Sequence, residues 1–186
     1  MATTTAEKLF KSEEVENLRG KMNIGRTTGT AAMQAAENEI PKQGGGISYL
    51  PEEGIIFFDP SGTPYQNPKM NNAFVTLAVA QKSDGSSYPF EFYLNSIVKT
   101  FCLCDKEGHY VDEEGKPSES QVWITTKGSL IDAYNKCKSV KEIYNLLAGC
   151  KNGVKVTCEK KWGISRNFRT GVESPKEMRN YTYDIL

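Results

Sequence analysis

The feature that most constrains this 186-residue chain is a pair of apolar segments joined by a short polar loop. Residues 73–81 carry apolar side chains on both alternating faces, and residues 88–94 place Phe90 and Phe92 on one face. A period of two residues indicates β-strands. The Asp84-Gly85 pair between them is typical of a hairpin turn. The chain therefore contains an antiparallel hairpin, and the fold is built on a β-sheet.

Other segments carry the same strand signal. Further strands are expected at residues 55–58, 97–104, 121–126, 154–162 and 181–186. Residues 105–120 and 163–176 are polar and contain glycine and proline, so both are expected to be loops. The resulting fold class is mainly β, a β-barrel of the OB type with one or two helices and an N-terminal extension.

Between the strands the apolar period changes to a helical one. Residues 130–137 place apolar side chains at helical spacing. Ser139-Val140-Lys141-Glu142 then matches a capping box, in which the serine hydroxyl and the glutamate satisfy the first free amides of a helix. Gly149 suits the end of that helix. Two short helices are therefore expected between residues 130 and 149.

Residues 1–46 differ from the rest and are assigned to an N-terminal arm, which leaves residues 47–186 as the β-rich, OB-like domain. The arm has few large apolar residues, and Gly44-Gly45-Gly46 reads as a linker. One weak helical stripe is present, made of Leu9, Phe10, Val15, Leu18 and Met22. A flexible or helical arm of this kind is expected to be dispensable for folding and to be able to hold a homo-oligomer together.

Composition limits the classes of protein that the chain can belong to. Lys+Arg and Asp+Glu both total 23, and a protein that coats duplex DNA by charge alone would usually be basic. No apolar run reaches the roughly 20 residues that span a bilayer, so no membrane association is expected. The N-terminus lacks a secretory pattern and the five cysteines are odd in number and scattered. These features indicate free thiols and a reducing, cytoplasmic location, which is the host cytoplasm if the protein is viral.

Motifs for catalysis or cofactor binding are weak. His109 is the single histidine and has no nucleophile at a recognisable spacing. The segment 25–30 lacks the lysine of a phosphate-binding loop. Cys102-x-Cys104 supplies two of the four ligands that zinc requires, and a buried structural role is the more usual one. The expectation is a protein that is not an enzyme and uses no cofactor and no metal.

The segment from Lys151 to Tyr183 combines basic and aromatic residues. Cations can follow a phosphate backbone while aromatic faces accept unstacked bases, and this mixture is typical of single-strand binding. The candidate nucleic-acid-binding residues are Lys155, Lys161, Trp162, Arg166, Phe168 and Arg169. An ordinary solvated strand whose tryptophan packs at the core edge is the alternative interpretation.

The order of strands, a capped helix, a strand, a basic loop and a final strand resembles single-stranded-DNA-binding proteins of the OB fold, of a phage type. The resemblance covers residues 54–186 and implies a non-catalytic protein of DNA replication that binds single-stranded nucleic acid, most often DNA. The acidic tail of bacterial members is absent at Tyr181–Leu186. A structural or assembly protein, such as a virion component that grips its neighbour with the N-terminal arm, is the alternative function.

Overall fold

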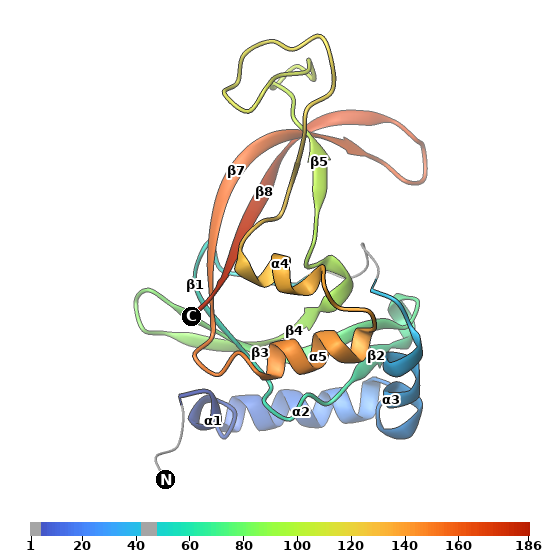
Figure 1. Ribbon diagram of the computed structural model, residues 1–186, viewed down its shortest axis with the longest axis vertical. Coiled ribbons are helices and arrows are strands. Elements are labelled where there is room, and N and C mark those ends of the chain that lie inside the picture. Colours follow the sequence, from blue (N-terminus) through green and yellow to red (C-terminus); the bar gives the residue numbers. More distant parts are fainter. Residues whose placement is uncertain (1–4, 42–47) are drawn as a thin grey trace.

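The computed structural model describes residues 5–41 and 48–186 (Figure 1). About 37% of the chain is strand and 27% is helix, so the prediction of a mainly β fold is confirmed. A six-stranded antiparallel sheet forms the body, and a two-stranded sheet lies beside it. The predicted boundary of the domain at residues 46 and 47, with its glycine linker, lies outside the described residues.

The large sheet has β3 near one end and a long hairpin at the other. Its strands are β1 (Glu53–Phe58), β2 (Tyr65–Asn67), β3 (Ala73–Lys82), β4 (Ser87–Tyr93), β7 (Val154–Arg166) and β8 (Glu173–Ile185). The strand order is β2-β3-β1-β7-β8, with β4 also paired to β3. The predicted β3–β4 hairpin is therefore confirmed. No pairing between β4 and β8 is found in the described chain, so the expected closed barrel does not form.

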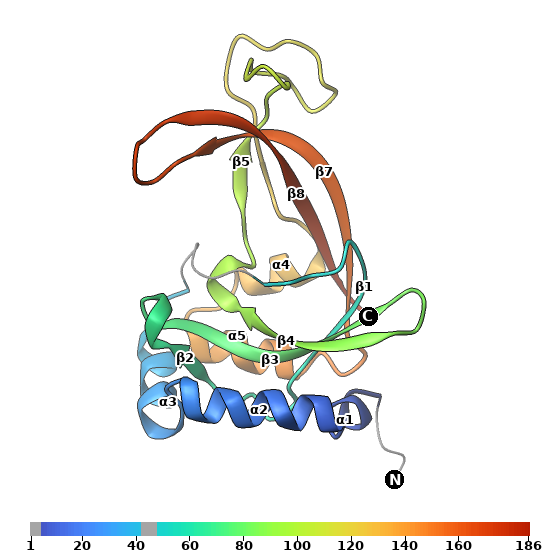
Figure 2. The ribbon, with the colours of Figure 1, turned by 180° about the vertical axis from the view of Figure 1, so that it is seen from behind.

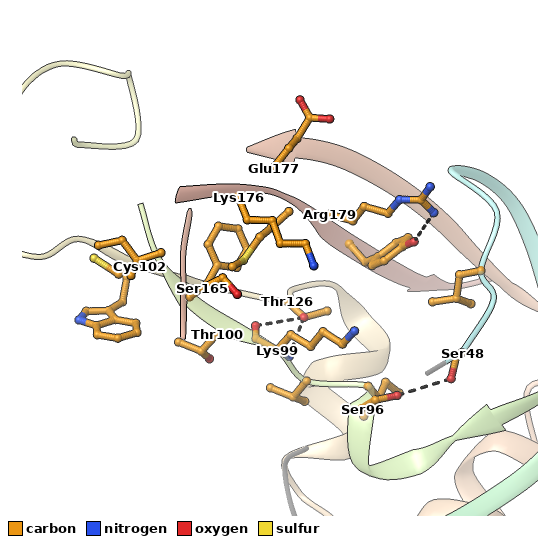
Figure 3. Close-up of a pocket in the computed structure, with 18 of the residues that line it drawn as sticks. Ser48, Ser96, Lys99, Thr100, Cys102, Thr126, Ser165, Lys176, Glu177 and Arg179 are labelled. Atoms are coloured by element: carbon orange, nitrogen blue, oxygen red, sulfur yellow. Dashed lines mark hydrogen bonds between the residues drawn. The ribbon is translucent and has the colours of Figure 1, made fainter. Parts of the chain in front are cut away.

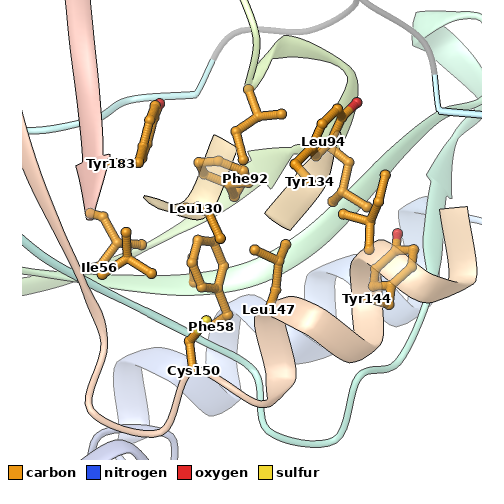
Figure 4. Close-up of a cluster of buried hydrophobic side chains, with 14 of the residues drawn as sticks. Ile56, Phe58, Phe92, Leu94, Leu130, Tyr134, Tyr144, Leu147, Cys150 and Tyr183 are labelled. Carbon is orange, nitrogen blue, oxygen red and sulfur yellow. The ribbon is translucent and has the colours of Figure 1, made fainter. Parts of the chain in front are cut away.

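Both faces of β3 are buried, which explains why its sequence is apolar at nearly every position. Phe74 and Ala78 face one cluster, which includes side chains from the helices α4 (Ser129–Tyr134) and α5 (Val140–Ala148). Phe92 and Tyr183 meet edge to face in this cluster (Figure 4). The predicted capping box at the start of α5 is confirmed, with both of its hydrogen bonds present.

The opposite face of the sheet is covered by the N-terminal segment, seen from behind in Figure 2. This segment forms α1 (Thr5–Leu9) and α2 (Glu13–Gly25), which lie on that face, and α3 (Gly29–Asn38), which packs against α5. Phe10, Val15 and Met22 are buried in one cluster with Val75 and Leu77 of β3. The helical stripe is thus confirmed, and it buries apolar area against the sheet. Few apolar residues suffice here because each of them lies against the sheet.

Ion pairs fix α2 to the sheet in addition to apolar packing. The Arg19 Nη1 atom donates to Asp59 Oδ2 at 2.9 Å, and Asp59 is buried. At the end of α2, Arg26 donates two hydrogen bonds to the carboxylate of Glu91 on β4, at 2.7 and 2.9 Å. A bidentate pair of this kind fixes orientation as well as distance. These contacts fix the position of α2 on the sheet.

The β7–β8 hairpin is longer than predicted and corrects the expected polar loop at residues 163–176. The pairing runs without interruption from Val154↔Ile185 to Arg166↔Glu173. Only residues 167–172 form the turn, in which Asn167 Oδ1 accepts the N–H groups of Arg169 and Thr170. Polar residues occupy both faces of the outer half of β8. The alternation that marks a half-buried strand is therefore missing from that part of the sequence.

The small sheet consists of β5 (Thr100–Cys102) and β6 (Trp123–Thr125). The predicted strand at residues 97–104 is shorter than expected, and the 3-10 turn η2 (Leu94–Ser96) precedes it. A second 3-10 turn, η1 (Pro68–Met70), follows β2. β5 reaches the long hairpin at Gly163, where an added Cβ would overlap the Phe101 ring. The close approach of ring and backbone requires glycine at this position.

No helix in the described ranges has the length and apolar character needed to cross a membrane. The five cysteines are unbonded, with Cys102, Cys104 and Cys150 buried and the other two half-buried. Burial raises the pKa of the Cys150 thiol, which keeps it protonated near neutral pH.

Candidate functional site

A cleft of about 1140 Å³ lies under the outer half of the β7–β8 hairpin. Its walls are β5 and β6 on one side, the hairpin on another, and residues 48–50 with η2 below (Figure 3). These segments are far apart in the sequence. The cleft therefore depends on the chain just after β5, where Leu103 forms an antiparallel bridge with Gly163 of the hairpin.

Lys99 lies in the cleft, and its backbone is held firmly. Its N–H donates to Thr126 Oγ1 at 2.9 Å, and its carbonyl accepts the N–H of Thr126 at 3.0 Å. The side chain extends into the cleft (Figure 3), and its walls lower the pKa of the amine by desolvation. A lysine held in this way gains from an anionic partner, because such a partner replaces the lost water.

Three more cations line the cleft from the hairpin: Arg166, Lys176 and Arg179. The acidic lining residues are Glu173 and Glu177, and the Glu177 carboxylate points outward in Figure 3. The cleft thus carries four cations and two carboxylates, although the whole chain has no net charge. The surplus of positive charge is local, and it favours an anionic ligand.

Arg179 is partly committed to contacts within the protein. Its Nη1 atom donates to the hydroxyl of Tyr181 at 3.3 Å, and its Nη2 atom lies 3.7 Å from Glu52. Glu52 also pairs with Lys160 at 2.9 Å, and these contacts lower the pKa of the Glu52 carboxyl. Lys99 and Lys176 are consequently the cations of the cleft that are most available to a ligand.

Exposed aromatic side chains stand at the cleft. Trp123 on β6 is 56% exposed, and Tyr49 is 72% exposed. The Tyr49 carbonyl accepts a hydrogen bond from the Tyr88 hydroxyl at 2.6 Å, which ties this segment to β4. Large aromatic residues are usually buried, so two exposed ones beside cations form a surface suited to stacking.

The six residues predicted to bind nucleic acid do not form one surface. Residues of a strand alternate between its faces, so Lys155 and Lys161 project from the face opposite to Trp162 and Arg166. In the β7–β8 ladder, Lys155 lies opposite Asp184 at one end of β7, and Arg166 lies opposite Glu173 at the other end. Lys155 and Arg166 are therefore separated by most of the length of β7.

Five of the six lie apart from the cleft walls. Trp162 is half-buried on β7, and the Lys161 amine lies 3.6 Å from Glu159 and 3.5 Å from the carbonyl of Glu113. Phe168 and Arg169 occupy the tip of the hairpin, where the Arg169 guanidinium lies 5.6 Å from the centre of the Phe168 ring. Of the predicted set, Arg166 is the residue that lines the cleft.

Sequence reasoning missed Lys99 and Trp123. One signal for Trp123 was present, because Val122 and Ile124 alternate with it and are the more buried neighbours. That alternation places Trp123 on the solvent face of its strand. Lys99 gives no such signal, since its position in the cleft depends on the pairing of β5 with β6.

Within residues 5–41 and 48–186, no group of three or more His, Cys, Asp or Glu side chains could hold a metal ion. His109 Nδ1 lies 3.3 Å from Asp105 Oδ2 in an exposed loop.

Comparisons with protein-family models, curated proteins and solved structures found no significant match. The site itself is therefore the basis for a function.

Proposed function

We propose that the chain is a non-catalytic protein that binds single-stranded nucleic acid, with DNA as the expected strand, in the cleft beneath the β7–β8 hairpin. The observation that carries this proposal is that four cations and two exposed aromatic rings line one cleft, and that Lys99 and Lys176 form no ion pair within the described residues. The order of strands, capped helix and closing hairpin supports an OB-like interpretation of the fold.

Each part of the cleft has a role in this proposal. Lys99 and Lys176 contact backbone phosphates, and Arg166 extends the basic path toward the hairpin tip. Trp123 offers a flat face to an unstacked base, which can be any base because every base has a π-face. A duplex keeps its base faces stacked inside, so the same surface favours a single strand.

The test is fluorescence anisotropy with a labelled oligo-dT and a matched duplex. Binding of oligo-dT in preference to the duplex is expected. Replacing Lys99 with alanine should flatten the log–log salt dependence by about 0.7, the value for one phosphate contact on a single strand. Lys138→Ala is the matched control, because Lys138 is exposed next to α5 and outside the cleft.

Stacking has a different signature from charge. Trp123→Ala should weaken binding about 5- to 150-fold at fixed salt, since stacking contributes about 1–3 kcal/mol per base. The salt dependence should stay nearly unchanged. In a Trp162→Phe background Trp123 is the remaining tryptophan, and oligo-dT should quench its fluorescence. Equal affinity of wild type, Lys99→Ala and Trp123→Ala would overturn the proposed site.

A structural or assembly protein is the second candidate function. It is favoured by the hairpin tip, where Phe168 is 90% exposed and Val172 is 62% exposed, away from the cleft. If neither oligo-dT nor the duplex binds, this second function replaces the first.

A further inference from the structure

The hairpin tip presents an apolar and basic surface on a rigid support. The turn is closed by a hydrogen bond from Asn167 N to the carbonyl of Val172 at 2.9 Å, besides the two that Asn167 Oδ1 accepts. Residues 166–172 contain two arginines and no carboxylate. Because the backbone of the turn is held by these hydrogen bonds, less backbone entropy is lost when the exposed Phe168 ring binds.

A second hollow, of about 550 Å³, lies where the loop at residues 105–120 meets the hairpin. Its apolar lining includes Tyr110, Pro117 and Pro175, and its carboxylates are Glu107 and Glu173. The loop from Asp105 to Glu119 contains six carboxylates against two lysines. The hollow falls within the range of about 300–1,000 Å³ that holds small organic ligands. It can therefore hold an aromatic side chain beside a cation.

The tip cannot reach the hollow of its own chain. The hollow includes Ile164 and Pro175, which are paired with each other in the ladder, and the pairing continues to Arg166 and Glu173 just before the turn. Folding the tip back would break this ladder. An occupant that carries the same tip must therefore be a second molecule.

We propose that the hairpin tip of one copy inserts into this hollow of a second copy. Phe168 packs between the tyrosine and proline side chains, and Arg169 pairs with Glu107 or Glu173. The donor and acceptor surfaces are different parts of the chain, so a contact that repeats head to tail is heterologous and produces an open filament or a ring. The N-terminal segment is not used, because its apolar stripe already covers its own sheet.

This contact is small compared with a stable interface, which buries roughly 1,200–2,000 Å². Self-association is therefore expected to be weak in dilute solution and to rise with protein concentration. Copies held close together, for example on one strand of nucleic acid, would associate at a higher effective concentration. The inference stands independently of nucleic-acid binding, and its test is made without nucleic acid.

The test uses two variants that each lose one surface. Phe168→Ala removes the aromatic ring at the tip. Ser174→Trp fills the hollow, because the exposed Ser174 is part of its lining. Both positions are exposed, so both variants should keep the wild-type melting temperature. In sedimentation velocity over a concentration series, wild type should form species larger than a dimer. Each variant alone should remain monomeric.

Mixing the two variants distinguishes this contact from any other self-association. An intact tip from Ser174→Trp can enter an intact hollow of Phe168→Ala, but no further copy can add. The 1:1 mixture should therefore form dimers and nothing larger. If Phe168→Ala associates as strongly as the wild type, or if the mixture stays monomeric, the proposal is overturned.

Discussion

Replacing Met22 with alanine tests whether the N-terminal helices belong to the folded core. Met22 on α2 is 2% exposed and lies in the same buried cluster as Val75 and Leu77 of β3. The central strand of a sheet cannot move to fill the space, so a cavity should remain. A buried methionine replaced by alanine costs about 2–5 kcal/mol. For a chain of this size each kcal/mol lowers the melting temperature by about 2–4 °C, which gives a shift of about 4–20 °C.

Met33 on α3 provides the matched control, because it is the same residue type in the same segment and is 37% exposed. Met33→Ala should change the free energy of unfolding by less than about 0.5 kcal/mol. Urea denaturation followed by circular dichroism measures both variants. If Met22→Ala unfolds at the same urea concentration as Met33→Ala, the helical layer is not part of the cooperative unit, and residues 1–46 are dispensable after all.

Three further outcomes follow from burial and local geometry. Burial raises the pKa of Tyr144 and Tyr183, so above about pH 10 the unfolded chain loses phenol protons that the folded chain keeps. The free energy of unfolding should then fall by about 1.4 kcal/mol per pH unit for each tyrosine. Denaturant titrations between about pH 9 and 11 measure this slope. A free energy of unfolding that does not change with pH would contradict the prediction. Gly163→Ala should cost about 1–3 kcal/mol in chemical denaturation, because the new methyl group overlaps Phe101, and no loss would show that the ring moves aside. Ser139→Ala should cost about 1 kcal/mol in the same assay by removing the cap of α5, and an unchanged midpoint would mean that the cap is not needed.

Several parts of the fold were accessible from the sequence because their signals are local. The hairpin of β3 and β4 shows a two-residue period and a turn composition within about twenty residues. The capping box of α5 occupies four consecutive residues. The stripe of Phe10, Val15 and Met22 on the N-terminal helices was visible for the same reason. In each case the residues that carry the signal are neighbours in the chain.

Other parts depended on contacts between distant segments. The outer half of β8 is paired but mostly exposed, so its residues show no apolar alternation that a sequence could reveal. The packing of the N-terminal segment depends on the sheet face that it covers. A few side chains bury much apolar area there because the facing surface of the sheet is also apolar.

The sequence by itself determined the class of fold, the β3–β4 hairpin, the capped helix and the presence of a basic and aromatic C-terminal segment. Only the tertiary structure decided which of those charged side chains lie on the same surface. Alternation along β7 separates Lys161 from Arg166, while the crossing of β5 brings Lys99 to Lys176 and Trp123. The physical reason is that strand pairing fixes faces and neighbours over long sequence distances, and those distances carry no local pattern.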